Sequence, residues 1–156
     1  MAYRETKKLI PEQAAYIAGL IDGEGTISLS RKHRYENRQL VVSISSTEIN
    51  LLKYVREAIG AGKITNKRSY SPRHLPSMCY AISNRQALGL LREVSPYLKS
   101  YKVARAGLIL KHYLRLTPRN GRYTAEQRKE RESFIKHFFS LRVSSRSHLF
   151  KPLDGC

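Results

Sequence analysis

A run of small, apolar and acidic residues near the N-terminus constrains the fold of this chain more than any other feature. Residues 14–27 read AAYIAGLIDGEGTI, in which Ala15, Ala18 and Gly19 follow the three- and four-residue steps that share one face of a helix. A face of such small side chains lets a second backbone approach closely. Because glycine inside a helix costs about 0.5 to 1 kcal/mol relative to alanine, Gly19 indicates a packing contact that compensates.

Two carboxylates follow at the predicted C-terminus of this helix. Asp22 and Glu24 alternate with Gly23 and Gly25 before Ile27 begins the alternating pattern of a strand. An acid at this end of a helix meets the negative end of the helix dipole, a local cost of about 0.3 to 1 kcal/mol that a bound cation would offset. The two acids therefore indicate chemistry rather than stability.

The composition indicates a polyanion as the partner. The 156 residues include 29 Lys and Arg against 12 Asp and Glu, a net charge of +17. Such an excess repels itself in isolation, and nucleic acid is a polyanion that would neutralise it. The length and the hydrophobic fraction of 41% predict one globular domain, which we place over residues 1–141. Residues 142–156 carry Arg142, Arg146 and Lys151 close to prolyl and glycyl breaks, which predicts a basic tail.

Several other classes of site have little support in the sequence. Cys79 and Cys156 lie far apart and form neither a disulfide framework nor a zinc motif, and the five histidines lack metal-ligand spacing. No apolar run approaches the roughly 20 residues of a membrane span. We therefore expect an intracellular protein with no membrane partner.

Hydrophobic periodicity predicts the order helix, hairpin, helix, hairpin, followed by further helices. The two hairpins merge into one four-stranded antiparallel sheet with helices on one face, which is an α+β fold. The predicted N-caps are Ser46 or Thr47, Ser83, Ser100 and Thr124. The predicted elements are helices over 11–24, 47–59 and 84–94, strands over 26–32, 39–45, 63–70 and 78–83, and helices that follow Ser100 and Thr124.

The sheet face that points away from the helices is predicted to be polar and basic. Strand alternation and the first connection place hydroxyl, amide and basic side chains there, and Glu36 is the one acid that breaks the pattern. Such a face fits the DNA major groove, where Lys and Gln read base edges and hydroxyls donate or accept. The predicted DNA contacts are Ser28, Ser30, Lys32, Arg34, Arg38, Gln39, Ser43, Lys63, Thr65 and Lys67.

The nine residues from Ile17 to Gly25, Ile-Ala-Gly-Leu-Ile-Asp-Gly-Glu-Gly, resemble the LAGLIDADG signature of homing endonucleases. Glu24 stands where the signature has Asp, and the family admits either acid. The resemblance extends over residues 9–115 and implies an αββαββα saddle on double-stranded DNA, with two signature helices packed together at its centre. This chain carries one signature, and cutting both strands needs two active sites. The resemblance therefore implies a homodimer on a long, roughly palindromic target.

The resemblance also implies a reaction. Glu24 and the backbone carbonyl of Gly23 are expected to hold a divalent cation, most naturally Mg²⁺, for hydrolysis of one phosphodiester on each strand with short 3′ overhangs. A lysine after the third helix is expected to stabilise charge near the scissile phosphate. That lysine is Lys102, or Lys99 if the alignment shifts.

Two further sets of site residues depend on the same resemblance. A polar residue at the end of the second strand orders water in relatives, and here it is Ser46 in one register or Glu48 in the other. The expected dimer contacts, in which Asp22 caps and packs at the dimer helix, are Ala15, Ala18, Gly19 and Asp22.

Other functions fit part of the sequence. Some relatives of this fold act as intron-splicing maturases or transcription regulators, which bind nucleic acid without cutting it. A ribosomal or other structural RNA protein matches the charge and size but leaves the signature helix unexplained. Since an acid beside a phosphate only repels it in a simple binder, the carboxylate of Glu24 favours the enzyme.

Overall fold

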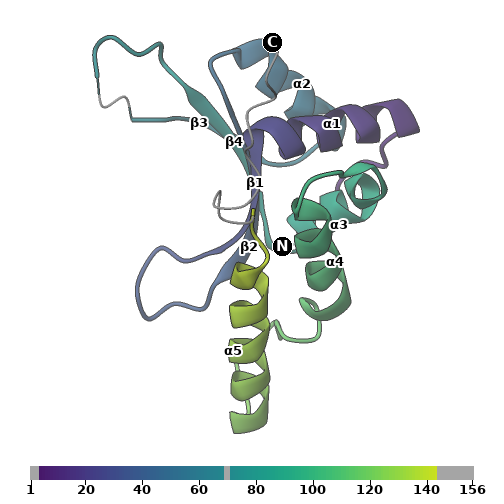
Figure 1. Cartoon of the computed structure of the whole chain (residues 1–156), viewed down its shortest axis with the longest axis vertical. Helices are drawn as coiled ribbons and strands as arrows, with labels where there is room; N and C mark the ends of the chain where they lie inside the picture. Colours follow the sequence, from purple (N-terminus) through teal and green to yellow (C-terminus); the bar gives the residue numbers. More distant parts are fainter. Residues whose placement is uncertain (1–3, 69–70, 144–156) are drawn as a thin grey trace, which may run out of the picture.

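The computed structural model describes residues 4–68 and 71–143, which form an antiparallel sheet covered by helices (Figure 1). The predicted α+β class and the order helix, hairpin, helix, hairpin are confirmed. In chain order the elements are α1 (Pro11–Glu24), β1 (Gly25–Ser30), β2 (Gln39–Ser46), α2 (Ile49–Ile59), β3 (Lys63–Asn66), β4 (Met78–Ser83), α3 (Asn84–Val94), the 3-10 turn η1 (Ser95–Tyr97), α4 (Lys102–His112) and α5 (Ala125–Ser140).

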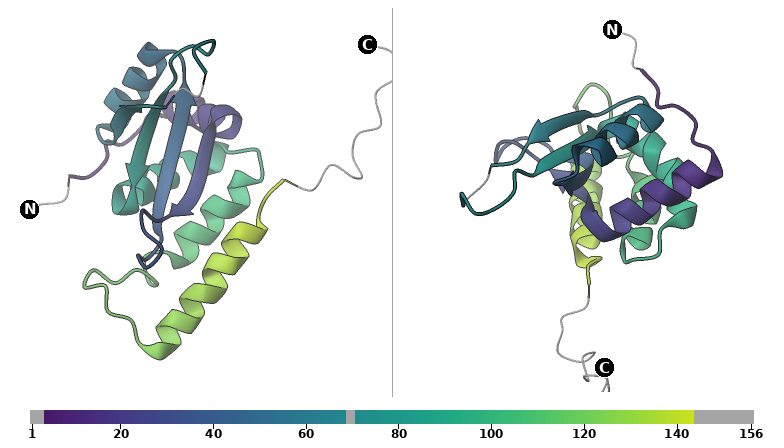
Figure 2. Two further views of the ribbon diagram at one scale, coloured as in Figure 1. Left: turned by 90° about the vertical axis from the view of Figure 1, so that its left-hand side faces the viewer. Right: turned by 90° about the horizontal axis from the view of Figure 1, so that it is seen from above.

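The four strands lie in the order β1-β2-β4-β3, so the two hairpins join through β2 and β4. Gly25 pairs with Ile44 at one end of β1 and Ser30 pairs with Gln39 at the other. The helices lie on one side of the sheet, and both hairpin connections project from the opposite side (Figures 1 and 2). This leaves β1 and β3 as the edge strands.

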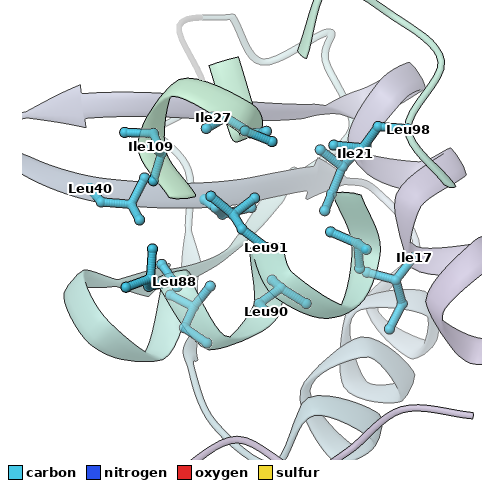
Figure 3. Packing of buried hydrophobic residues seen from close by; sticks show 14 of the residues in the cluster. Ile17, Ile21, Ile27, Leu40, Leu88, Leu90, Leu91, Leu98 and Ile109 are labelled. Carbon is cyan, nitrogen blue, oxygen red and sulfur yellow. The ribbon is translucent and has the colours of Figure 1, made fainter. Parts of the chain in front are cut away.

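A hydrophobic core fills the space between the sheet and the helices. Ile27 of β1 and Leu40 of β2 pack with Leu91 of α3 and Ile109 of α4, and all four are buried (Figure 3). Ile21 brings α1 into the same cluster. Since burying such a side chain stabilises a fold by about 1.5 to 3 kcal/mol, this core fixes where the last turn of α1 lies.

The start of α2 differs from the prediction. Its N-cap is Glu48, so the prediction of Ser46 or Thr47 is wrong. Ser46 instead ends β2, and its hydroxyl accepts a hydrogen bond from the backbone N–H of Glu48 at 3.0 Å.

The N-caps of the later helices match the prediction in part. Thr124 is the N-cap of α5 as predicted, and it forms a capping box with Gln127. Ser83 is the N-cap of α3 but makes no side-chain cap bond, and the N-cap of α4 is Tyr101 rather than Ser100.

No helix in the described residues is long and apolar enough to cross a membrane.

The third strand is shorter than predicted. β3 ends at Asn66, and the backbone N–H of Lys67 donates to the carbonyl of Ser77 at 2.8 Å just beyond it. The predicted end of this strand at residue 70, and all but the first two residues of the predicted basic tail, lie outside the described residues.

Arginine side chains donate hydrogen bonds to carbonyl oxygens on the unpaired edge of β1. Helix α5 runs beside this edge (Figure 2). Arg105 donates to the carbonyl of Ile27 at 2.9 Å and to that of Leu141, just after α5, at 2.7 Å. Arg38 donates to the carbonyl of Leu29 at 3.0 Å. Both guanidinium groups also lie over phenylalanine rings of α5. An edge strand with unpaired carbonyls is a template for aggregation, and these contacts protect it.

Candidate functional site

The last turn of α1 places the two signature acids in different surroundings. Asp22 is half-buried and Glu24 is exposed. Within the described residues no hydrogen bond or ion pair engages the Glu24 carboxylate. A Cβ on Gly25 would lie 2.7 Å from Cα of Ile21 and 2.9 Å from the carbonyl oxygen of Ser43, so only glycine lets α1 run directly into β1.

Asp22 caps backbone groups of its own chain. Its carboxylate accepts hydrogen bonds from the backbone N–H groups of Lys99 (2.7 Å) and Ser100 (3.1 Å) and from the Ser100 hydroxyl (2.5 Å). Burial raises the pKa of Asp22, but these hydrogen bonds and the charge of Lys102 outweigh burial and hold it below the ordinary value. Asp22 thus ties α1 to the α3–α4 connection, and its contacts do not place it on the exposed stripe of α1.

Lys102 is buried and also reaches α1. Its Nζ donates to the carbonyl oxygens of Ile21 at 2.7 Å and Asp22 at 2.8 Å, which puts a positive charge at the C-terminus of the helix. Burial lowers the pKa of Lys102, Asp22 raises it, and Arg105 lowers it, with a net shift below the ordinary value. Lys99 contacts α1 only through its backbone N–H. The structure thus brings Lys102, rather than the Lys99 side chain, to the last turn of α1.

One face of α1 is exposed and carries small residues. Ala15, Gly19 and Gly23 are exposed, and a Cβ added to either glycine would meet no described atom within 4 Å outside the backbone of α1. We call these three positions the small-residue stripe. Ala18 is fully buried in the core of its own chain, so the prediction that it meets a partner helix is wrong.

The free face of the sheet forms an open groove of about 1290 Å³. It lies at the end of the sheet where Ser30 pairs with Gln39, away from Glu24. Among the described residues that line it, Glu36 is the only acid. The predicted DNA contacts that line the groove are Ser30, Lys32, Arg38, Gln39, Lys63 and Thr65.

The other predicted DNA contacts lie outside this groove. Ser28 and Ser43 are half-buried on the same sheet face, and the Ser43 hydroxyl lies 2.7 Å from that of Thr26. Arg34 and Lys67 are exposed in the two hairpin connections. The predicted residues therefore lie on the free face of the sheet and in the two hairpin connections, which leave opposite ends of the sheet.

Sequence reasoning missed residues at the middle and at one end of this face. Cys79 and Ala81 of β4 alternate with buried Tyr80, so they share the free face, and the alternation that was used for β1 and β2 would have found them. Arg119 and Tyr123, in the α4–α5 connection, form an end wall of the groove. Their positions depend on tertiary packing, and no local pattern signals them.

A hydrogen-bonded chain orients Gln39 in the groove. Its side-chain oxygen accepts from the Asn84 amide at 3.1 Å, and the Asn84 oxygen accepts from the Tyr113 hydroxyl at 2.9 Å. The Tyr113 oxygen in turn accepts from the backbone N–H of Leu40 at 3.0 Å. The side-chain amide of Gln39 is therefore held in one orientation at the groove.

Ser46 lies at the same end of the sheet as Glu24. The pairing of Gly25 with Ile44 sets this position, and the Ser46 hydroxyl already accepts the N–H of Glu48. Glu48 is exposed at the start of α2. Ser46 at the end of β2 and Glu48 before α2 therefore both lie past the Gly25–Ile44 pair, at the end of the sheet nearest Glu24.

A cation site is only partly provided by one chain. Among the described residues no group of three or more His, Cys, Asp or Glu side chains could hold a metal ion. Glu24 offers one carboxylate, and Gly23 offers a carbonyl in the same turn. This set fits Mg²⁺, which is commonly held by one or two carboxylates and takes its other ligands from water and phosphate.

Comparison with known proteins gives the family. A sequence profile described as LAGLIDADG endonuclease matches residues 17–109, more than half of the chain. The fold is similar to that of the homing endonuclease I-CvuI, solved in complex with its target in the presence of Ca (TM-score 0.69, 17% identity, 87% of this chain and 85% of that chain). It is also similar to the archaeal intron-encoded homing endonuclease I-Vdi141I complexed with DNA (0.56, 16%, 88% and 89%) and to the LAGLIDADG meganuclease I-AabMI bound to uncleaved DNA (0.55, 21%, 78% and 43%). At these identities the likeness shows the shared fold. Because the profile carries the signature helix and the sheet together, the chain belongs to the LAGLIDADG endonuclease family.

Proposed function

We propose that this chain is a site-specific DNA endonuclease that works as a homodimer and cuts both strands of a long, roughly palindromic target. The observation that carries the proposal is the position of Glu24, exposed and unpaired within the described residues at one end of a sheet face that is almost free of acids. Family membership and the DNA complexes of the similar proteins support it.

The sheet face supplies the DNA-binding surface. β1 runs for roughly 17 Å from Gly25 to Ser30, and the groove begins at its Ser30 end, beside the β1–β2 connection. Basic and amide side chains at the groove, such as Lys63 and Gln39, suit base edges and phosphates. Each chain would therefore read one half-site outward from its own Glu24.

The small-residue stripe of α1 supplies the dimer contact. Ala15, Gly19 and Gly23 allow a second α1 to approach closely about a two-fold axis. Beside this stripe Tyr16 and Tyr54 form an edge-to-face pair with ring centroids 5.6 Å apart, and both are exposed at 47% and 40%. Exposed aromatic rings are enriched in the centres of protein interfaces. This contact would bring two copies of the α1 C-terminus together, one for each DNA strand.

The last turn of α1 supplies the groups for the cleavage reaction. Glu24 and the carbonyl of Gly23 would hold a divalent cation, which when bound neutralises phosphate charge and lowers the pKa of a coordinated water. Water adds to the phosphorus, the bond from phosphorus to the 3′ oxygen breaks, and the 3′ oxygen takes a proton. Lys102 fixes the carbonyls that precede Gly23 and adds positive charge to this turn. Ser46 or Glu48 would help to order water at the strand end.

Cleavage of a selected duplex tests the proposal. A duplex recovered by binding selection from a randomised library is incubated with protein and Mg²⁺, and wild type should give double-strand breaks with short 3′ overhangs. Glu24→Gln should bind this duplex and leave it intact, while the control Glu132→Gln, an exposed acid on α5, should cut like wild type. Equal cutting by Glu24→Gln would refute the catalytic assignment. Binding by wild type without any cutting would favour a maturase or a regulator instead.

A further inference from the structure

The β1–β2 connection, residues 31–38, contains Glu36, the one acid among the described residues that line the groove. The Glu36 carboxylate accepts hydrogen bonds from within the connection. Glu36 Oε2 accepts hydrogen bonds from the backbone N–H groups of Lys32 and His33, each at 3.3 Å. The backbone N–H of Glu36 donates to the His33 carbonyl at 3.1 Å, and His33 Nε2 lies 4.0 Å from Oε1. The Glu36 side chain therefore links the two ends of this turn.

Arginines fix the rest of this connection. Arg31 donates to the carbonyl of Arg34 across the turn at 2.8 Å. At the base, Arg38 donates to the carbonyl of Leu29, and buried Arg131 of α5 donates to the carbonyl of Arg38. The connection is thus anchored to the body of the protein, and Glu36 organises its outer part.

The organised part presents side chains that suit DNA. Lys32 and Tyr35 line the groove, and Tyr35 is 94% exposed. Ordering a loop only upon binding costs conformational entropy, whereas a loop held in place beforehand avoids that cost. The hydrogen bonds that the Glu36 carboxylate accepts from backbone N–H groups hold the segment that carries these two side chains.

Electrostatics alone predicts that Glu36 weakens DNA binding. A carboxylate among phosphate-binding groups repels DNA over a screening length of about 8 Å at physiological salt, so removing it should tighten binding. We propose that Glu36 is a positioning residue for sequence recognition: it holds the β1–β2 connection in the shape that presents Lys32 and Tyr35 to the bases and phosphates. The inference rests on the proposed DNA-binding function. It gives binding changes of opposite sign for a charge effect and for a positioning effect.

Fluorescence anisotropy with two labelled duplexes separates these effects. One duplex is recovered by selection with wild-type protein, and the other has the same length and composition in scrambled order. Glu36→Ala should bind the selected duplex about tenfold more weakly because two hydrogen bonds are lost, and the scrambled duplex as well as or better than wild type. Glu36→Gln, whose amide oxygen can still accept, should stay within about threefold of wild type on the selected duplex.

A matched control and two outcomes decide the result. Glu132→Ala changes the net charge equally but lies on α5 outside the groove lining, so it should bind both duplexes like wild type or slightly more tightly. Equal or tighter binding of the selected duplex by Glu36→Ala would refute the positioning role, and so would an equal loss on both duplexes. If wild type itself showed no preference for the selected duplex, the proposed DNA recognition would fall, and this inference with it.

Discussion

Replacing Asp22 should cost stability, whereas replacing Glu24 should cost only cleavage, although one glycine separates the two acids. Asp22 accepts three hydrogen bonds, at 2.7, 3.1 and 2.5 Å, from the α3–α4 connection. Hydrogen bonds to charged groups contribute about 1.5 to 3 kcal/mol each, and partial exposure of the Asp22 carboxylate reduces this to about 1 kcal/mol each. Asp22→Ala should therefore lower the free energy of unfolding by about 3 kcal/mol. For a chain of this length that corresponds to a drop in Tm of about 6 to 12 °C.

Thermal unfolding followed by circular dichroism measures this difference. All variants are compared at one protein concentration, because the Tm of an oligomer depends on concentration. Asp22→Asn keeps one acceptor oxygen and should lose about half as much stability as Asp22→Ala. Glu24→Gln should unfold within about 2 °C of wild type, because its carboxylate has no partner among the described residues. A Tm for Asp22→Ala equal to that of wild type, or an equal loss in Glu24→Gln, would refute the separation of structural and catalytic acids.

Three further predictions follow from α1 and α5. Gly19→Leu should leave each chain folded, since no described atom outside the backbone of α1 lies within 4 Å of an added Cβ. The same change should weaken the dimer by at least tenfold in sedimentation equilibrium, and an unchanged dimer would exclude the stripe as the interface. Arg131→Gln, which disrupts hydrogen bonds from a buried guanidinium to three oxygen acceptors, should cost about 2 to 4 kcal/mol in urea unfolding, and exposed Arg128→Gln should cost almost nothing. Folding lowers the pKa of Asp22, so the unfolded chain binds more protons in acid. The contribution of Asp22 to stability should therefore be lost as the pH falls below about 4, and Asp22→Asn should reduce that dependence.

The sheet and its two faces could be predicted because alternation is a local property. In β1 and β2 the apolar residues Ile27, Leu29 and Leu40 occupy every second position, and they form the core as expected. The opposite positions point the other way, so Ser30 and Gln39 lie on the free face, where they line the groove.

The register of α1 was predicted only in part, because small residues occur on both of its sides. Ala14 and Ala18 share the buried face with Ile17 and Ile21, whereas Ala15 belongs with the exposed glycines. Small size alone does not distinguish a residue that packs in the core from one that packs against a partner helix. The positions of the isoleucines did contain that information, because residues one turn apart share a face.

Contacts between distant parts of the chain account for the remaining differences. The ammonium of Lys102 bonds to carbonyls about eighty residues earlier, and no local pattern predicts that it caps α1. Gln86 likewise donates to the carbonyl of Arg4 instead of closing a capping box with Ser83. In both cases tertiary packing favours a hydrogen-bond partner far along the chain over a partner in the same helix.

A mixed dimer tests the central claim most directly. Two differently tagged copies, one wild type and one Glu24→Gln, are co-expressed, purified through both tags and given a supercoiled plasmid that carries the selected target with Mg²⁺. If each chain contributes one catalytic acid to one strand, the mixed dimer should convert the plasmid to the nicked circle, whereas the wild-type dimer should give the linear form. Linear product from the mixed dimer at the wild-type rate would contradict the account.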